Sequence, residues 1–503
     1  MSYYPSIDEC HQFNQEFNLL PVYKEVMMDT DTPITLYQRL LEQGEARFLL
    51  ESAEGGEKWG RYSFIGLTPF CQAKGDAEGL HLRFADGRVE SRAGNPLTEL
   101  QYLLDQYRSP VQSEGPRFTG GAVGYLGYDV LRYREKLPDA ATDDLGVSDF
   151  ALLFTDQLLV VDHHRQRLRI YVNLHVPIGS SRLQVEEAYH CAIRRIETVY
   201  QQVTQPSVHA PSPQLPAETV TPDLSSNMTQ GQFVRNVMKA KEYIAQGDIF
   251  QVVLSQRFEK QTTVDPFLVY RVLRLTNPSP YMYHMILPEA QVVGTSPELL
   301  IRVESGHIET VPIAGTRRRG KNAAEDKALA EELLGDAKER AEHTMLVDLG
   351  RNDIGRVAQF GTVETDEFMR IERFSHVMHL VSHVHGQLRE ELHPLDALLS
   401  CMPAGTVSGA PKLRAMEIIS ELEPQKRGVY AGAIGYLGFD GNLDTCIAIR
   451  TILFRHGKAY IQAGAGIVAD SDPLSEYEET RSKARACALA IEIAERQLSF
   501  QGE

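Results

Sequence analysis

The chain has 503 residues, of which 43% are hydrophobic and 24% charged, an ordinary composition for a globular protein of two domains or one large unit. The net charge of -17 argues against a nucleic-acid partner, because phosphate binding needs a basic surface. No apolar run approaches the ~18 residues of a membrane span, and the first residues lack a signal-peptide pattern. Six cysteines without C-x-x-C spacing indicate free thiols. We therefore expect a cytoplasmic protein with no membrane partner.

The N-terminal region, residues 1–202, contains strand-like runs at 150–161 and 168–174. A proline-rich segment follows at 203–228, with five prolines and few large apolar side chains between positions 206 and 222. Such a segment cannot bury enough surface to fold, so we expect an extended linker between two regions.

Regular structure is predicted to resume at Thr229, which opens the C-terminal region, residues 229–497. There T-Q-G-Q predicts a capping box for a helix that ends near Gly247, followed by a strand at 249–258. Two further strand-like runs lie at 451–454 and 459–463.

Two segments repeat one another across the linker: GAVGYLGYD at 121–129 and GAIGYLGFD at 432–440. The match indicates a duplicated architecture in which both regions carry related strands, although a convergent strand and turn would also explain it. We predict an α+β fold with large, mostly antiparallel sheets packed between helices, and we expect the two regions to share sheets.

Four carboxylates come in two E-x-x-E pairs on predicted helices: Glu339, Glu342, Glu476 and Glu479. Residues three apart share a helix face, so each pair can act together. Oxygen ligands without His or Cys favour Mg²⁺ over a softer metal. Glu342 shares its helix face with Leu346 and Leu349, which predicts burial. The alternative is a pair of solvated faces with weak surface ion pairs, such as Glu479 with Lys483.

Glycine-rich turns lie at 314–316, 404–412 and 463–467. None is a Walker A loop or a dinucleotide-binding G-x-G-x-x-G run, so the turns do not predict a nucleotide site. They can instead bring backbone N–H groups close to a ligand carboxylate. Arg450, Lys412 and Lys483 are candidates to neutralise such a carboxylate directly.

Eight segments follow one another in the C-terminal region: QVVLSQ at 251–256, GTSPE at 294–298, PIAGT at 312–316, LVDLGRND at 346–353, VMHL at 377–380, GTVSGAPK at 405–412, QAGAGI at 462–467 and EYEETRSK at 476–483. Through these segments the chain, from about Thr229 to Gln497, resembles the chorismate-utilising enzymes, which implies their fold.

The residues at two positions distinguish the reactions that members of this family catalyse. Members that activate water carry a lysine where this chain has Gln251, and members that use a covalent lysine carry it where this chain has Ala314. The pattern that remains resembles the anthranilate synthases, in which ammonia attacks C2 of chorismate and pyruvate is then lost. The large subunit of an aminodeoxychorismate synthase, on the folate branch, is the alternative enzyme. A non-catalytic tryptophan sensor on a decayed scaffold is the alternative of another class.

The resemblance also implies a role for individual residues. Glu298 matches the acid that protonates the departing hydroxyl, and His379 matches the residue of the aromatisation step, with Thr406 nearby. The chorismate contacts carried over are Gly315, Thr316, Tyr430, Arg450, Gly464, Ala465, Gly466 and Lys483. The Mg²⁺ ligands carried over are Glu342 and Glu479, supported by Glu339 and Glu476.

Two further segments resemble the tryptophan-feedback motif of the anthranilate synthases. The first is LLES at 49–52 with Ser63 beyond it, and the second is NPSPYM at 277–282. The residues expected to bind L-tryptophan are Glu51, Ser52, Asn277, Pro280, Tyr281 and Met282. The plain alternative is a strand and turn capped by Ser52.

The source of ammonia is missing from the chain. A glutaminase needs a nucleophilic cysteine on a tight glycine elbow, and Cys401, Cys446 and Cys487 lie in S-C-M, T-C-I and A-C-A contexts. We therefore expect a separate glutamine amidotransferase subunit, in a heterodimer or heterotetramer.

Overall fold

The computed structural model of the chain describes residues 3–52, 60–112, 115–138, 141–206, 222, 224–373 and 377–501. Most of the predicted linker 203–228 lies outside these residues. Regular structure extends into both ends of the predicted linker: α5 (Arg182–Thr204) ends at Thr204, and β12 (Ser225–Ser226) lies shortly before Met228. Of the helices in the described segments, none is long and apolar enough to cross a membrane. All six cysteines are free, as predicted.

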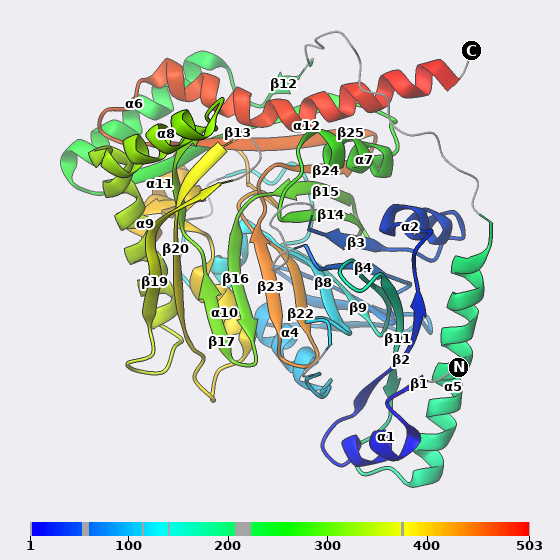
Figure 1. Cartoon of the computed structure of the whole chain (residues 1–503). Coiled ribbons are helices and arrows are strands. Elements are labelled where there is room, and N and C mark those ends of the chain that lie inside the picture. Colours follow the sequence, from blue (N-terminus) through cyan, green and yellow to red (C-terminus); the bar gives the residue numbers. More distant parts are fainter. Residues whose placement is uncertain are drawn as a thin grey trace.

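The described strands form two antiparallel sheets, named sheet A and sheet B (Figure 1). Sheet A runs in the order β1 (Tyr3–Tyr4), β2 (Leu19–Met27), β11 (Arg167–His175), β10 (Gln157–Asp162), β4 (Tyr62–Gly66), β3 (Phe48–Glu51), β14 (Tyr281–Ile286), β15 (Gln291–Ser296), β24 (Thr451–Arg455), β25 (Lys458–Ile467), β13 (Gln251–Gln261) and β12, with β21 (Gly409–Ala410) on β13. Strands from before residue 203 form one half of this sheet and strands from after it form the other half, and the two halves join where β3 pairs with β14.

Sheet B has the same mixed origin. Its order is β18 (Ile313–Arg318), β20 (Val377–Gln387), β17 (His307–Thr310), β16 (Leu299–Glu304), β23 (Leu443–Ile447), β22 (Ala433–Gly438), β8 (Gly121–Leu126), β9 (Phe150–Thr155), β5 (Cys71–Asp76), β6 (Gly79–Phe84) and β7 (Val89–Arg92), with β19 (Glu364–Arg373) on β20.

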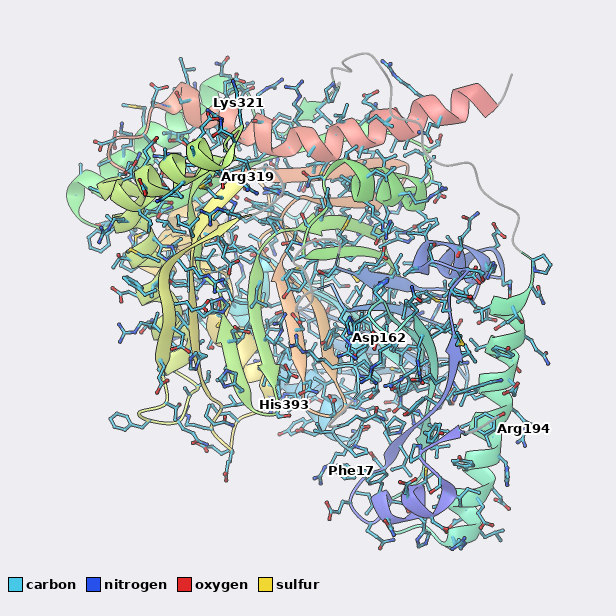
Figure 2. The ribbon with its side chains drawn as sticks, viewed as in Figure 1. Phe17, Asp162, Arg194, Arg319, Lys321 and His393 are labelled. Atoms are coloured by element: carbon cyan, nitrogen blue, oxygen red, sulfur yellow. The ribbon has the colours of Figure 1, made fainter. Side chains whose placement is uncertain are left out.

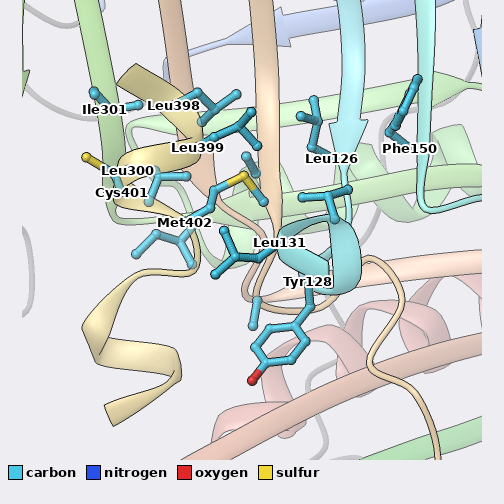
Figure 3. Close-up of a cluster of buried hydrophobic side chains, with 14 of the residues drawn as sticks. Leu126, Tyr128, Leu131, Phe150, Leu300, Ile301, Leu398, Leu399, Cys401 and Met402 are labelled. Carbon is cyan, nitrogen blue, oxygen red and sulfur yellow. The ribbon is translucent and has the colours of Figure 1, made fainter. Parts of the chain in front are cut away.

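Helices cover the outer faces of both sheets. On sheet A they are α2 (Pro33–Glu42), α5, α7 (Pro266–Thr276) and α12 (Pro473–Gln501). On sheet B they are α4 (Pro96–Asp105), α9 (Ala337–Gly355) and α10 (Pro394–Cys401), whereas α6 (Gln230–Gln246) and α11 (Lys412–Leu422) pack against β13 at the end of sheet A. Figure 3 shows where α10 packs on sheet B, with Leu398, Leu399 and Met402 against Leu300 and Ile301. The remaining helices are α1 (Ile7–Phe13) and α8 (Ala323–Gly335), with the 3-10 turns η1 (Tyr128–Tyr133) and η2 (Gly405–Val407). The α+β prediction is confirmed.

The two sheets pack face to face through an apolar layer of their own. In β8, Val123 and Tyr125 point into this layer, whereas Ala122 and Leu126 point to the helix side. Because side chains alternate along a strand, both faces of β8 are buried, and its sequence is apolar throughout.

The two repeated segments lie side by side, because β8 pairs with β22 in antiparallel register. Gly124 pairs with Gly435, the fourth residue of one repeat with the fourth of the other, and Gly121 pairs with Gly438. The repeats are thus related by a local two-fold axis between the two central glycines.

The predicted strand 150–161 is wrong as a single element. It is two strands, β9 in sheet B and β10 in sheet A, and the chain crosses between the sheets at Asp156. The buried Asp156 carboxylate accepts hydrogen bonds from both terminal nitrogens of Arg195, at 2.9 and 3.0 Å. The polar residues Thr155, Asp156 and Gln157 mark the crossing, and the residues on either side of them are apolar because both strands have two buried faces.

The predicted helix after the linker is confirmed as α6. Thr229 and Gln232 form the capping box, and Gly247 ends the helix in the left-handed conformation. The strand after it, β13, begins two residues later and ends three residues later than predicted.

Replacing Gly124 by Val should destabilise the protein strongly. A Cβ at this position would lie 2.0 Å from the carbonyl oxygen of Ala151 in β9, and a backbone atom in the middle of a sheet cannot move aside. We expect a loss of at least about 2 kcal/mol in a urea unfolding experiment. Gly335→Ala is the control, because no atom lies within 4 Å of its added Cβ. Equal unfolding midpoints for G124V and the parent would contradict the close approach of β8 and β9.

Candidate active site

The residues predicted for catalysis and chorismate binding gather where α9, α12, β18, β20 and β25 meet (Figure 1). Their charges act on one another: desolvation raises the pKa values of Glu298 and Glu342, and Lys483 opposes both shifts, with Arg450 also opposing that of Glu298. Desolvation lowers the pKa of His379, and Arg450 adds to that shift. Residues almost 200 positions apart in the sequence therefore share one electrostatic environment.

Glu298 lies in the turn between β15 and β16, and its backbone carbonyl accepts a hydrogen bond from the amide of Ile447 at 3.0 Å. The hydroxyl of Thr406 in η2 donates to Glu298 Oε1 at 2.9 Å. Desolvation raises the pKa of Glu298 to about 7, although the Thr406 hydrogen bond and two nearby cations oppose the shift. A substantial fraction of this carboxyl group is therefore protonated at neutral pH and can donate a proton.

His379 on β20 faces the turn that contains Gly315 and Thr316. Its Nδ1 lies 3.0 Å from the Gly315 carbonyl oxygen and 3.1 Å from Thr316 Oγ1. A carbonyl oxygen only accepts, so Nδ1 carries the proton and Nε2 carries the lone pair of the neutral ring. Desolvation lowers the pKa of His379, which favours the neutral form. The site thus holds an acid and a base whose pKa values are shifted in opposite directions.

Gly315 is needed for the shape of this turn. It lies at a bulge in the pairing of β18 with β20, and its φ of 69° is in the left-handed region. A Cβ at this position would lie 3.1 Å from Glu339 Oε2 and from Leu333. Glycine therefore lets the backbone turn approach α9 closely.

The glycines of β25 lie on one face of the strand and Ala465 on the other. A Cβ at Gly464 would lie 2.7 Å from the Tyr430 hydroxyl, and one at Gly466 would lie 2.7 Å from Gln251 Nε2. Ala465 instead faces the helix-side core. Of the three predicted contacts on β25, Ala465 can thus offer a ligand only its backbone.

Arg450 and Lys483 are the predicted partners for substrate carboxylates. Arg450 follows β23 with a φ of 50°, and its carbonyl accepts from the amide of Thr295 at 3.2 Å. The Lys483 ammonium lies 2.7 Å from Glu479 Oε1 and donates to the Gly464 carbonyl at 3.1 Å. Lys483 therefore connects α12 with the β25 glycines.

The four glutamates lie on α9 and α12, as predicted, and interact electrostatically. Desolvation and the charges of Glu339 and Glu479 raise the pKa of Glu342, while desolvation and the charge of Glu479 raise the pKa of Glu476. The predicted burial of Glu342 is wrong, because Glu342 and Glu479 are exposed and the other two are half-buried. Solvent reaches both exposed carboxylates, although neighbouring protein atoms still desolvate Glu342.

This cluster fits a hard divalent cation by its chemistry. All its donors are carboxylate oxygens, and their mutual repulsion is what a cation would relieve. Their oxygens are not converged: the three groups of metal-ligating atoms within 4.8 Å of one another, among the residues with described positions, do not include these glutamates. Lys483 pairs with Glu479 instead, and Arg317 pairs with Glu339.

The two halves of the predicted tryptophan motif lie side by side, because β3 pairs with β14 and Glu51 is opposite Met282. Leu50, Ser52, Pro280 and Tyr281 contribute to the wall of a cavity of about 1120 Å³. The cavity is separate from Glu298 and His379, which do not line it.

Glu51 and Met282 also line this cavity, and both have further contacts within the protein. The Glu51 carboxylate accepts hydrogen bonds from Tyr270, from Arg274 at 3.1 Å and from Ser63 at 3.4 Å. It is only 7% exposed, so its charge is largely matched within the protein. Met282 is 1% exposed and packs among the side chains under α7.

Asn277, the remaining predicted contact, caps the end of α7. Its carbonyl accepts a hydrogen bond from Thr295 at 2.5 Å. Its buried Nδ2 has no hydrogen-bond partner among the described residues.

The sequence analysis did not identify Arg427, a buried residue that packs against the site from the protein interior. Its side chain is 1% exposed and forms a 2.6 Å ion pair with Glu423. It also donates to the carbonyls of Val407 in η2 and Val253 in β13, both at 2.7 Å. Its guanidinium lies 5.5 Å from the centre of the Tyr430 ring. The four-residue spacing from Glu423 was visible in the sequence, but it is equally typical of a surface ion pair.

Lys412 is structural and does not face a ligand. It is buried in an ion pair with Asp353 at 2.9 Å and donates to the carbonyls of Ser400 and Cys401. This pair fixes the start of α11 to α9 and α10.

Comparisons with known proteins agree with this geometry. Residues 45–488 match the family model described as chorismate binding enzyme. Relatives named anthranilate synthase component 1 include one from Acetivibrio thermocellus, 50% identical over 98% of this chain and 99% of its own, and one from Aquifex aeolicus, 47% identical over 97% and 98%.

Solved structures give the same result. The crystal structure of anthranilate synthase component I from Streptococcus pneumoniae TIGR4 matches with a TM-score of 0.74 and 38% identity, over 92% of this chain and 99% of that one. MenF, the menaquinone-specific isochorismate synthase of Escherichia coli, shares the fold alone, at 19% identity and a TM-score of 0.66, over 96% of this chain and 98% of its own. The chain therefore belongs to the family of chorismate-binding enzymes.

Proposed function

We propose that this protein is the large subunit of an anthranilate synthase, which aminates chorismate at C2 and then eliminates pyruvate. The observation that carries the proposal is the pair of opposite pKa shifts in one cleft, upward for Glu298 and downward for His379. The names and near-complete coverage of the relatives support it.

The two shifted groups suit the two proton transfers of this reaction. In the first stage, ammonia bonds to C2, the ring double bonds shift and the 4-hydroxyl departs. Glu298 supplies the proton with which it leaves as water. In the second stage, the C2 proton is removed, the bond to the enolpyruvyl oxygen breaks and the ring becomes aromatic. The lone pair on Nε2 of His379 accepts that proton.

Chorismate is a dianion, and the cleft offers cations and backbone donors to it. Arg450 can bind a carboxylate through two parallel hydrogen bonds, and Lys483 can bind as a point charge. The turns at Gly315–Thr316 and Gly464–Gly466 allow the substrate to approach the backbone, and the Tyr430 hydroxyl lies beside the second turn.

Glu342 and Glu479, with Glu339 and Glu476 in support, would hold Mg²⁺. The bound ion would draw electron density from the ring carboxylate of chorismate and so activate C2. The positive charge of the ion would also offset the repulsion between these carboxylates and the dianionic substrate.

The chain has no glutaminase elbow, so ammonia would come from a separate glutamine amidotransferase subunit in a cytoplasmic heterodimer or heterotetramer. Ala314 supports this reaction over the folate-branch alternative, because it offers no amine for a covalent step. L-Tryptophan would bind in the 1120 Å³ cavity beside Ser52, Pro280 and Tyr281 and inhibit from there.

The purified chain should form anthranilate from chorismate, Mg²⁺ and an ammonium salt, but not from chorismate and glutamine. Anthranilate is measured by its fluorescence. Glu342→Gln should abolish turnover, because the metal site loses a charged ligand. The matched control is Asp348→Asn, an acid-to-amide change on the exposed side of α9. Glutamine-dependent product would disprove the two-subunit assignment, and normal turnover in E342Q would remove the glutamates from the mechanism.

The pH profile of kcat/KM should be bell-shaped. Activity should rise below the usual pKa of a histidine as His379 loses its proton, and it should fall as Glu298 ionises near pH 7. Thr406→Val removes a hydrogen bond that stabilises the ionised carboxylate, so the falling limb should move to higher pH. A falling limb that stays in place in T406V would show that Glu298 is not the group that titrates.

Tryptophan should inhibit the enzyme, and Ser52→Phe should abolish the inhibition by filling one end of the cavity. Uninhibited kcat and KM should change little, because the cavity is separate from Glu298 and His379. Ser91→Phe, at an exposed position on β7, is the control. Unchanged tryptophan inhibition in S52F would place the inhibitor elsewhere.

A further inference from the structure

Arg317 uses all three guanidinium nitrogens to join separate parts of the site. Nε donates to Glu332 at 2.9 Å, and Nη2 donates to Asp336 at 2.8 Å. Nη1 donates to Glu339 at 3.3 Å and to the Thr316 carbonyl at 3.0 Å. The side chain is 22% exposed, so solvent reaches only part of this network.

Through Asp336 the guanidinium holds the start of α9. Asp336 is the N-cap of that helix and accepts hydrogen bonds from the amides of Lys338, at 3.0 Å, and Glu339, at 3.2 Å. Fixing the cap and the first turn restricts rotation of the helix about its axis. Glu342 lies three residues after Glu339 on the same face, so its direction is restricted too.

Glu339 also connects Arg317 to the turn that contains Gly315 and Thr316. Glu339 Oε2 lies against Gly315, where an added Cβ would be 3.1 Å away, and the Gly315 carbonyl binds His379 Nδ1. Arg317 thus stands between the acidic cluster on α9 and the turn that orients the base.

The two arginines that follow make different contacts. Arg318 pairs with Glu325, and Arg319 pairs with Asp326, both in the first turn of α8. Figure 2 shows Arg319 and Lys321 at the α8 end of the molecule. Within the part of the chain that the structure describes, Arg317 forms an ion pair with Glu339, one of the four glutamates.

We infer that Arg317 is a positioning residue, which orients Glu339 and α9 for the divalent cation and ties that cation's site to the Gly315–Thr316 turn. The inference rests on the metal site of the proposed function. Residues that orient metal ligands typically change metal affinity by about 10- to 100-fold when they are removed.

Two possible roles of Arg317, as a competing positive charge and as a group that orients Glu339, predict opposite effects on Mg²⁺ binding. If Arg317 acted only as a competing cation, its removal would strengthen Mg²⁺ binding, and lysine would behave like arginine. If it orients Glu339, its removal weakens binding, and lysine fails as well because it lacks the planar fork.

The test is calorimetric titration of Mg²⁺ into the full-length chain without chorismate, with the melting temperature measured for each variant. Arg317→Met should weaken Mg²⁺ binding about tenfold or more, and Arg317→Lys should weaken it by at least about threefold. Arg318→Met is the matched control and should bind within about twofold of the parent. Asp336→Asn is a second variant that keeps the helix cap but removes a charged partner of Arg317, and it should also weaken binding.

Parent-like or tighter binding in R317M would overturn the inference while leaving the metal site intact. Equal weakening in R318M would assign the effect to the charge of the arginine run and also overturn it. If the parent itself bound no Mg²⁺, the metal role in the proposed function would fail, and the inference would fail with it.

Discussion

The antiparallel pairing of β8 with β22 is the constraint on which the rest of the structure depends. Gly124 and Gly435 pair with one another near the centre of sheet B, and each lets its strand approach its other neighbour closely, β8 to β9 and β22 to β23. Functional residues flank the second repeat and its partner strand: Tyr430 precedes β22, and Arg450 follows β23. Because both faces of these strands are buried, two apolar layers hold these residues in place.

Desolvation acts differently at the two sides of the cleft. It keeps Glu298 partly protonated and His379 neutral where the surrounding protein excludes water. On α9 and α12 it adds to the mutual repulsion of carboxylates that remain open to solvent. An acid–base pair thus lies beside a cluster that needs a cation, and Arg317 and Lys483 are the protein's own cations in contact with that cluster.

Local signals in the sequence predicted local structure well. The cap at Thr229 and the glycine at 247 placed α6, and the E-x-x-E spacing placed both carboxylate pairs on helices. Tertiary context decided the rest. A few polar residues within an apolar run do not show that the chain changes sheets there, as at Asp156, and an apolar helix stripe does not show that one of its members faces solvent, as at Glu342. Arg427 and Arg317 were missed because their partners come from several separate segments.

Because each sheet joins a block of early strands to a block of late strands, the topology also sets the order in which the chain can fold during synthesis. β8 leaves the ribosome about 300 residues before β22, and β3 about 230 residues before β14, so their edges stay unpaired while the rest is made. Unpaired apolar edges invite association with other chains, and contacts this distant in sequence form slowly. The first 200 residues therefore do not form a complete domain before the later strands are synthesised. They depend on strands made later, and the nascent chain is open to aggregation until β22 and β14 arrive.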